Sequence, residues 1–208
     1  MDVKLKSNSE TLDQVQQLGE ELRGLRKAHG LTLQDLADAS GKSVSFISKI
    51  ERGLARPSIT ALQDIAEALS VPIGWFFQTD GPVPADERPY IVRKDRRRRL
   101  TYSGMTSTTD YMGFADHLLS ASLDGELALG LSEYAPGGTS GDDLYTHKGE
   151  EAGLVIEGEI ELALDKEVFR LSAGDSFSFP ASIPHTYRNP GKVVAKVVWA
   201  NTPVSLRR

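Results

Sequence analysis

The chain has 208 residues, of which 25% are charged and 39% are hydrophobic. No apolar run approaches the roughly 18 residues of a membrane-spanning helix, so we expect a soluble protein, and the length predicts two small domains. The absence of cysteine excludes disulfides and thiolate metal sites and is typical of a cytoplasmic protein. The first ten residues, MDVKLKSNSE, lack the apolar core of a targeting signal.

The most informative stretch is residues 30–58, which contains two helix-start signals on either side of a tight turn. Thr32 followed by Asp35 is a variant of the capping box, and Gly41 ends the helix that it opens. Ser43 caps the next helix. The apolar spacing turns five residues toward a core, namely Leu33, Leu36, Ala37, Ile47 and Ile50. Two short helices joined by a glycine-containing turn predict a helix-turn-helix unit, whose second helix can enter the major groove of DNA.

Apolar residues at steps of three and four predict a further helix on each side of this unit. They are Val15, Leu18, Leu22 and Leu25 before Gly30, and Ile59, Leu62, Ile65, Ala66 and Leu69 after the start signal Pro57-Ser58. With a short fifth helix at 73–77, the N-terminal domain is predicted to be all-α with four or five helices. An ordinary helical bundle whose polar residues merely face water is the alternative interpretation.

Residues 14–77 resemble the Xre/Cro/C1-type helix-turn-helix family, in particular through Thr32-Leu33-Gln34, Leu36-Ala37, Ile47-Ser48, Ile50-Glu51-Arg52-Gly53 and Pro57-Ser58. The resemblance implies sequence-specific binding of double-stranded DNA. It gives base-facing positions to Val44, Ser45, Ser48 and Lys49. It gives phosphate contacts to Gln34, Ser43 and Arg52. Glu51 occupies a position that braces the fold, and each of the other side chains could instead be an ordinary solvated residue.

A proline-stiffened connector, Asp80-Gly81-Pro82-Val83-Pro84, ends the helical pattern and is followed by the cationic run Arg93-Lys94-Asp95-Arg96-Arg97-Arg98-Arg99. The run could track the DNA backbone, pair with acids of a neighbouring subunit, or form a solvated edge segment of the second domain. We therefore expect a helix-turn-helix domain at 14–78, a linker with a basic segment at 79–100 and a second domain at 101–208.

The charge is uneven along the chain. Residues 1–80 carry −2, residues 81–100 carry +4 and residues 101–208 carry −7, which together give −5. A net negative charge is not the usual footprint of a nucleic-acid-binding protein. DNA binding therefore requires a local basic face and, we expect, two copies of the chain.

From residue 100 onward the periodicity changes from helical to strand-like. Apolar residues alternate with smaller or polar ones at Leu127, Leu129 and Leu131, at Ile160, Leu162 and Leu164, and at Phe177 and Phe179. Many short strands at close spacing predict an antiparallel sandwich or barrel. The chain is thus predicted to be an α+β protein of two domains, the first all-α and the second an antiparallel β-barrel.

Two stretches of the second domain resemble the two halves of the cupin signature, which implies a jelly-roll barrel. The matching positions are His147, Glu151 and Gly158 in the first half and Gly174, Pro180, His185 and Asn189 in the second. Two departures matter. Tyr145 stands where the family has its first histidine, and Ser182 replaces a glycine. The loss of a ligand histidine weakens the case for a tightly held metal.

His147 and Glu151 lie four residues apart, which on a straight strand separates them by about 13 Å, too far for one metal. Gly149 permits the bend that would bring them together. If His185 joins them from another strand, two imidazoles and a carboxylate form a facial set suited to Fe, Mn or Zn as divalent cofactor. Tyr145 would be a weaker fourth partner. Alternatively, these four side chains bind an organic ligand directly.

A helix-turn-helix domain followed by a cupin resembles the cupin-sensor transcription regulators of the putrescine-utilisation repressor type. The resemblance covers nearly the whole chain and implies a cytoplasmic homodimer on operator DNA, in this case a repressor whose cupin senses a small-molecule effector. The acidic domain and Glu151 favour a cationic effector, such as an amine or an amino acid. No catalytic residue and no membrane partner are expected.

The competing class is an enzyme. The mononuclear iron epoxidase of phosphonate antibiotic synthesis also joins a helix-turn-helix-like domain to a cupin and uses the same His-x-x-x-Glu spacing. A complete recognition helix with Lys49 and Arg52 facing outward favours the regulator. A third class, a protein that binds another protein through its helices, would show no salt-dependent DNA affinity. Among the remaining residues, His29 and His117 are predicted to be structural, and Trp199 and Tyr187 line the barrel mouth or pack inside it.

Overall fold

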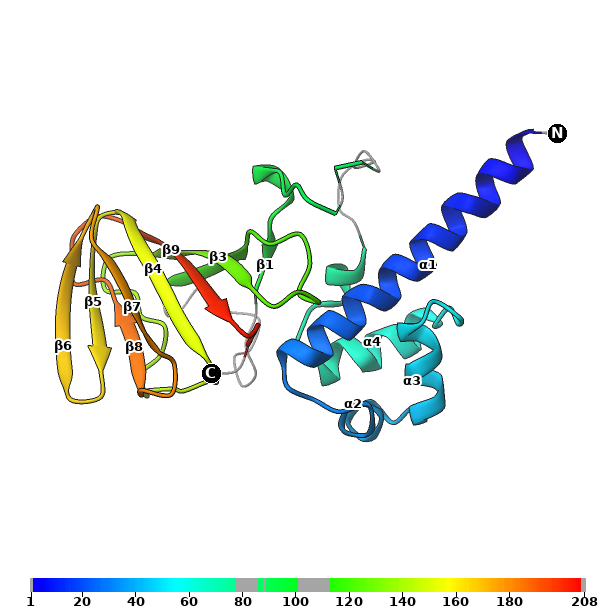
Figure 1. Ribbon diagram of the computed structural model, residues 1–208, viewed down its shortest axis with the longest axis horizontal. Coiled ribbons are helices and arrows are strands. Elements are labelled where there is room, and N and C mark those ends of the chain that lie inside the picture. The colour runs from blue at the N-terminus through cyan, green and yellow to red at the C-terminus, as the bar shows by residue number, and fades with distance from the viewer. Residues whose placement is uncertain (1, 78–85, 88, 101–112, 207–208) are drawn as a thin grey trace. The chain divides into compact units, whose positions relative to one another are not determined.

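A computed structural model describes residues 2–77, 86, 87, 89–100 and 113–206, with side chains from residue 14 onward. The chain divides into two compact units, residues 1–81 with 122–125 and residues 82–121 with 126–208. Figure 1 shows helices in the first unit and strands in the second. The connector predicted at 80–84 lies outside the described residues.

The first unit has the predicted helices. They are α1 (Asp2–Ala28), α2 (Leu33–Ser40), α3 (Val44–Glu51), α4 (Ile59–Ala68) and the short 3-10 helix η1 (Ile73–Phe76). α1 extends further toward the N-terminus than the apolar pattern from Val15 predicts. The helices meet in a core of completely buried side chains, which includes Leu22, Leu25, Leu36, Ile47, Ile50 and Ile65.

Not every predicted core residue of this unit is buried: Val15, Leu18 and Leu33 are half-buried, and Ile59 lies outside the core. Ile59 is 72% exposed, whereas Leu62 and Ile65 are buried as predicted. Ile59 is the first residue of α4 and precedes the buried stripe of that helix by almost one turn. The periodicity therefore extended the apolar face of α4 one position too far.

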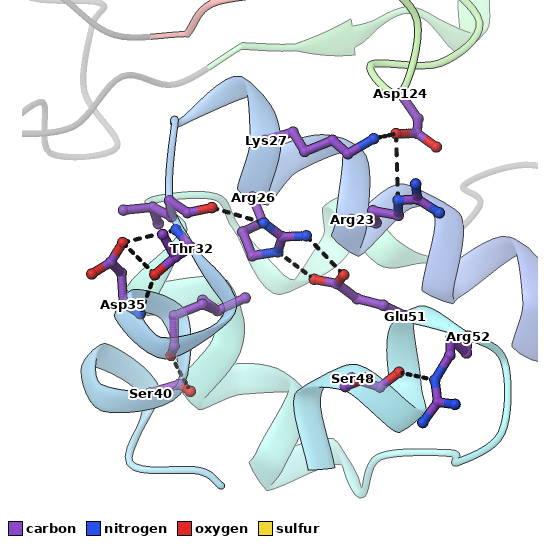
Figure 2. A network of polar contacts seen from close by, with 12 residues as sticks. Arg23, Arg26, Lys27, Thr32, Asp35, Ser40, Ser48, Glu51, Arg52 and Asp124 are labelled. Atoms are coloured by element: carbon purple, nitrogen blue, oxygen red, sulfur yellow. Dashed lines mark hydrogen bonds and ion pairs between the residues drawn. The ribbon is translucent and has the colours of Figure 1, made fainter. Parts of the chain in front are cut away.

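Local hydrogen bonds define the ends of α2 and the start of α3. Thr32 Oγ1 accepts a bond of 3.1 Å from the Asp35 amide, and the Asp35 carboxylate accepts one of 2.8 Å from the Thr32 amide, as Figure 2 shows. Gly41 adopts the left-handed conformation with φ of 64°, which favours glycine after a helix. Ser43 Oγ accepts from the Phe46 amide. The predicted start and stop signals are confirmed.

The second unit is an antiparallel β structure, as predicted for the cupin fold. Its elements are η2 (Lys94–Arg96), β1 (Arg98–Arg99), β2 (Phe114–Leu118), β3 (Ala128–Tyr134), β4 (Glu150–Glu157), β5 (Glu159–Leu164), β6 (Glu167–Ser172), β7 (Ser176–Pro180), β8 (His185–Arg188) and β9 (Ala195–Thr202). One sheet has the strand order β1-β2-β3-β9-β4-β7, and the other has the order β6-β5-β8.

The cationic run of residues 93–99 forms η2 and the short edge strand β1. Arg98 pairs with Leu118, and Arg99 pairs with His117 of β2. Arg93 forms an ion pair of 2.6 Å with Glu87. This arrangement favours the edge-segment interpretation, and a DNA role for the run stays a prediction.

The face of β3 that lies inside the barrel differs from the one that its leucines suggest. Ala128, Ser132 and Tyr134 are buried on the same side of the strand. Leu127 precedes the strand and is 54% exposed, so its assignment to the strand is wrong. Apart from Tyr134, the inward positions of β3 carry small residues, which leaves room for the Trp199 ring of the partner strand β9.

Gly130 of β3 and Gly153 of β4 leave room for two aromatic rings. Trp199 of β9 lies in register with Gly130 of β3 on one side and with Gly153 of β4 on the other. A Cβ atom at Gly130 would lie 2.1 Å from Trp199 Cζ2, and one at Gly153 would lie 2.3 Å from Phe177 Cζ. The rings of Trp199 and Phe177 therefore occupy space that a side chain at Gly130 or at Gly153 would fill.

Candidate DNA-binding face and cupin pocket

The predicted base-facing residues lie along α3. Ser45 and Lys49 are exposed, and Val44 and Ser48 are half-buried, while Ile47 on the opposite face is completely buried. The helix therefore presents its polar side to solvent and its apolar side to the core. That orientation is the one a recognition helix requires.

The predicted phosphate-contacting residues flank this helix. Gln34 and Arg52 are exposed, and each makes one local bond: Gln34 Nε2 donates to Asp38 at 2.8 Å, and Arg52 Nε donates to the Ser48 carbonyl at 3.2 Å. Ser43 is exposed at the N-terminus of α3, where its hydroxyl accepts from a backbone amide. A helix N-terminus with an exposed hydroxyl suits a phosphate oxygen.

A buried ion pair fixes α3 against α1. Arg26 Nε lies 2.6 Å from Glu51 Oε1, and a second guanidinium nitrogen donates to Glu51 Oε2 at 3.0 Å. Arg26 also donates to the Leu31 carbonyl at 2.8 Å, so one side chain links three segments, as Figure 2 shows. Glu51 thus braces the fold, as the resemblance implied. Its partner Arg26 was missed, because a cation in the last turn of a long helix carries no sign of a distant acid.

In the second unit, the structure brings together the three residues of the predicted triad. Nε2 of His147 lies 2.9 Å from Glu151 Oε2, and Nε2 of His185 lies 3.5 Å from the same oxygen. His147 and Glu151 approach each other because the chain bends at Gly149, which has a φ of 90°. His185 comes from β8 in the other sheet.

The histidine rings are oriented by backbone carbonyls. Nδ1 of His185 donates to the Ile183 carbonyl at 2.7 Å, and Nδ1 of His147 lies 3.2 Å from the Lys148 carbonyl. A carbonyl oxygen only accepts, so each Nδ1 carries the hydrogen of this contact and each Nε2 faces Glu151. Nε2 of His147 lies within hydrogen-bond distance of Glu151 Oε2, which only accepts, and in the described part of the chain Nε2 of His185 has no hydrogen-bond partner.

This donor set fits a divalent metal ion. The three ligand atoms lie within 4.8 Å of one another. Ligands at about 2.0–2.2 Å from one ion lie roughly 3 Å apart, close to two of the distances measured here. A metal held by His147, Glu151 and His185 would offset the charge of the Glu151 carboxylate and supply a Lewis-acidic point for an oxygen of a bound molecule.

Glu151 is ionised in this site. Burial alone would raise the pKa of its carboxyl, but the contacts with His147, His185 and Tyr187 hold the pKa at about 2. Tyr187 donates its phenol hydrogen to Glu151 Oε1 at 2.6 Å. Burial and the charge of Glu151 raise the pKa of Tyr187 well above its usual range, so this phenol remains a donor.

Two of the three triad residues line a pocket of this unit, whereas His185 is completely buried and is not among the lining residues. His147 and Glu151 line it together with five aromatic rings, those of Tyr134, Tyr145, Phe177, Tyr187 and Trp199. Tyr145, the predicted weak fourth ligand, packs edge-on against His185 with ring centroids 4.3 Å apart.

Three polar residues of the pocket region were not predicted. Asp116 is buried and accepts from Trp199 Nε1 at 2.9 Å and from Ser132 Oγ at 2.7 Å. Ser132 and Asn201 line the pocket itself. No motif marks them, because they become neighbours only through the pairing of β2, β3 and β9.

Comparisons with known proteins identify both domains. The helix-turn-helix family matches residues 22–76, and the cupin-domain family matches residues 130–201. The chain is 29% identical over 187 residues to the HTH-type transcriptional regulator PuuR of Escherichia coli K12. The aligned region covers 90% of this chain and 95% of that protein. The chain is also 28% identical over 177 residues to the HTH-type transcriptional regulator SutR of the same strain. That aligned region covers 84% of this chain and 88% of SutR. The chain belongs to the helix-turn-helix transcriptional regulators with a cupin domain.

The solved structures that resemble this chain include an enzyme. A solved structure of hydroxypropylphosphonic acid epoxidase from S. wedmorenis is 22% identical, with coverage of 90% of this chain and 97% of that chain and a TM-score of 0.44. A likeness at this level does not bear on activity. PuuR and SutR match nearly end to end and are HTH-type transcriptional regulators, which agrees with the regulator interpretation.

Two further properties of the regulator follow from its class and its helices. Regulators of the helix-turn-helix type bind DNA and are often dimeric. Among the helices that the structure describes, none is long and apolar enough to cross a membrane.

Proposed function

We propose that the regulator is a dimeric repressor whose cupin pocket binds a small cationic metabolite and thereby changes its affinity for an operator. The observation that carries this proposal is the pairing of an outward polar α3 with a buried, ionised Glu151 in an aromatic pocket. The domains proposed for the two roles are residues 14–78 and 101–208, joined by a segment at 79–100. A cytoplasmic location fits this role.

On DNA, we assign base contacts to Val44, Ser45, Ser48 and Lys49 and phosphate contacts to Gln34, Ser43 and Arg52. The exposure of Ser45, Lys49, Gln34 and Arg52 supports these assignments. One small domain supplies few cationic contacts, so tight binding requires two. Two-fold symmetry then implies a near-palindromic operator with half-site centres about 34–36 Å apart or a multiple of that distance.

In the pocket, we assign effector binding to Tyr145, His147, Glu151 and His185. A buried carboxylate among aromatic rings favours a cation, because the ion pair and the ring faces both attract positive charge. The same three ligand atoms fit Fe, Mn or Zn. A metal and an organic cation compete for Glu151, so metal content is part of the test.

Footprinting the purified protein on the DNA upstream of its own gene tests the regulator. Operator release is then titrated with amines and amino acids, for wild type and for Glu151→Gln. We expect the variant to fold and to bind the operator as wild type does, but not to respond to the effector. Stoichiometric iron with substrate turnover and no footprint would overturn the proposal in favour of an oxygenase.

A further inference from the structure

Asn201, near the end of β9, carries a buried hydrogen-bond acceptor that the fold leaves unused. The residue is only 5% exposed and lines the pocket. Its Nδ2 donates to the Ser205 carbonyl at 3.0 Å, which fixes the orientation of the amide, since a carbonyl can only accept. Oδ1 has no hydrogen-bond partner among the described residues.

An unused buried acceptor destabilises a fold, so it is uncommon where nothing binds. Water or a ligand can remove that cost only where there is space, and here the space is the pocket. A residue that lines the cavity therefore carries a polar group that the described residues do not satisfy.

Asn201 lies directly beside Glu151. The two residues are cross-strand partners of β9 and β4, and both are buried. Cβ atoms of such partners are about 5 Å apart, so one nitrogen with two or three hydrogens can donate to both side chains at once. A carboxylate and an amide oxygen together form an acceptor pair.

The residues around Glu151 and Asn201 favour a positively charged ligand with a carbon chain over an anion. No lysine or arginine lines the pocket in the described part of the chain. Trp199 stands two residues before Asn201 on the same strand, and its ring is fixed by the bond to Asp116 and by the room above Gly130. The ring face can contact the carbon chain next to a bound nitrogen.

We propose that Asn201 makes the pocket selective for an ammonium group that carries N–H donors, as in primary amines, over a quaternary ammonium of similar size. This inference rests on the proposed cationic effector and names the property that distinguishes one class of cation from another. A quaternary ammonium can use Glu151 and the aromatic rings, but it has no hydrogen to donate to Oδ1 of Asn201.

The test is calorimetric titration of the metal-stripped full-length protein with n-butylammonium and with its N-trimethyl analogue. We expect wild type to bind the primary ammonium about tenfold more tightly or better, as one hydrogen bond from a charged donor predicts. Asn201→Leu removes the acceptor at similar volume and is expected to abolish that preference while binding of the N-trimethyl analogue is retained. A preference that survives in Asn201→Leu overturns the proposal.

Asn201→Asp covers the case in which the leucine variant fails to fold. It keeps an acceptor at the same position, so the preference for the primary ammonium should equal or exceed that of wild type. Loss of the preference in a folded Asn201→Asp overturns the proposal. If wild type binds neither probe, the inference and the cationic effector both fail, while footprinting still decides the regulator separately.

Discussion

The helix-turn-helix segment of α2 and α3, with the Arg26–Glu51 pair behind it, and the cupin pocket differ in how their polar groups are satisfied. In the helical unit, Arg26 and Glu51 satisfy each other through two hydrogen bonds, and the caps Thr32 and Ser43 satisfy the first amides of their helices. In the pocket, Oδ1 of Asn201 and Nε2 of His185 lack hydrogen-bond partners among the described residues. The polar groups of the DNA-binding segment are hydrogen-bonded within the protein, whereas polar groups of the pocket are left for a ligand.

The largest expected effect tests the self-sufficiency of the helical unit. Glu51→Gln removes the charge that faces Arg26, whose side chain is only 12% exposed. Breaking a buried pair lowers the free energy of unfolding by about 3–5 kcal/mol. We expect operator binding to be lost near physiological temperature while amine binding persists, as followed by thermal unfolding and titration.

Glu67→Gln on the exposed side of α4 is the matched control, because it makes the same chemical change on the surface. It should change stability by less than about 0.5 kcal/mol. Equal costs for the two variants would contradict a structural role of the ion pair.

An intermediate effect is expected on the pocket side. Gly130→Ala places a Cβ 2.1 Å from Trp199 Cζ2, so the indole must move into the cavity or β3 must shift. Overpacking of this kind lowers stability by about 1–3 kcal/mol. Amine affinity should fall while the operator footprint at low temperature is unchanged.

The partner variant Trp199→Phe gives the corresponding control. It removes the atom that the new Cβ would meet, so the double variant Gly130→Ala/Trp199→Phe should be more stable than additivity predicts. Strict additivity of the two free energies of unfolding would show that the ring does not depend on the glycine.

The smallest expected effect separates base reading from anchoring within the DNA-binding face. Lys49→Ala should reduce discrimination at one base position by roughly 1–3 kcal/mol. Arg52→Ala should weaken binding to all sequences alike and reduce the slope of affinity against salt by about one unit. Gel-shift titrations on operator and random DNA at several salt concentrations measure both, and equal losses on both DNAs for both variants would show that the face is misassigned.

The helical unit could be predicted almost completely because its signals are local. A capping box joins residues three apart, a terminal glycine needs only its own φ, and the buried stripe of a helix repeats every three or four residues. These relations hold within one turn of chain, so Thr32, Gly41 and Ile47 were placed correctly from their neighbours alone. Ile59 was the exception, because where a stripe stops depends on the partner helix.

The residues of the pocket likewise divide into those that the sequence predicted and those that it did not. His147, Glu151 and His185 were expected together because the chain resembles a family with that spacing, and Gly149 explains locally how two of them meet. Asp116, Gly130 and Asn201 belong to strands far apart in the sequence and become neighbours only through strand register. Register is decided by the whole sheet, since one residue of slip would exchange its two faces. The sequence therefore determined the class of the protein and its local elements, and the tertiary structure alone decided which polar groups the pocket leaves for a ligand.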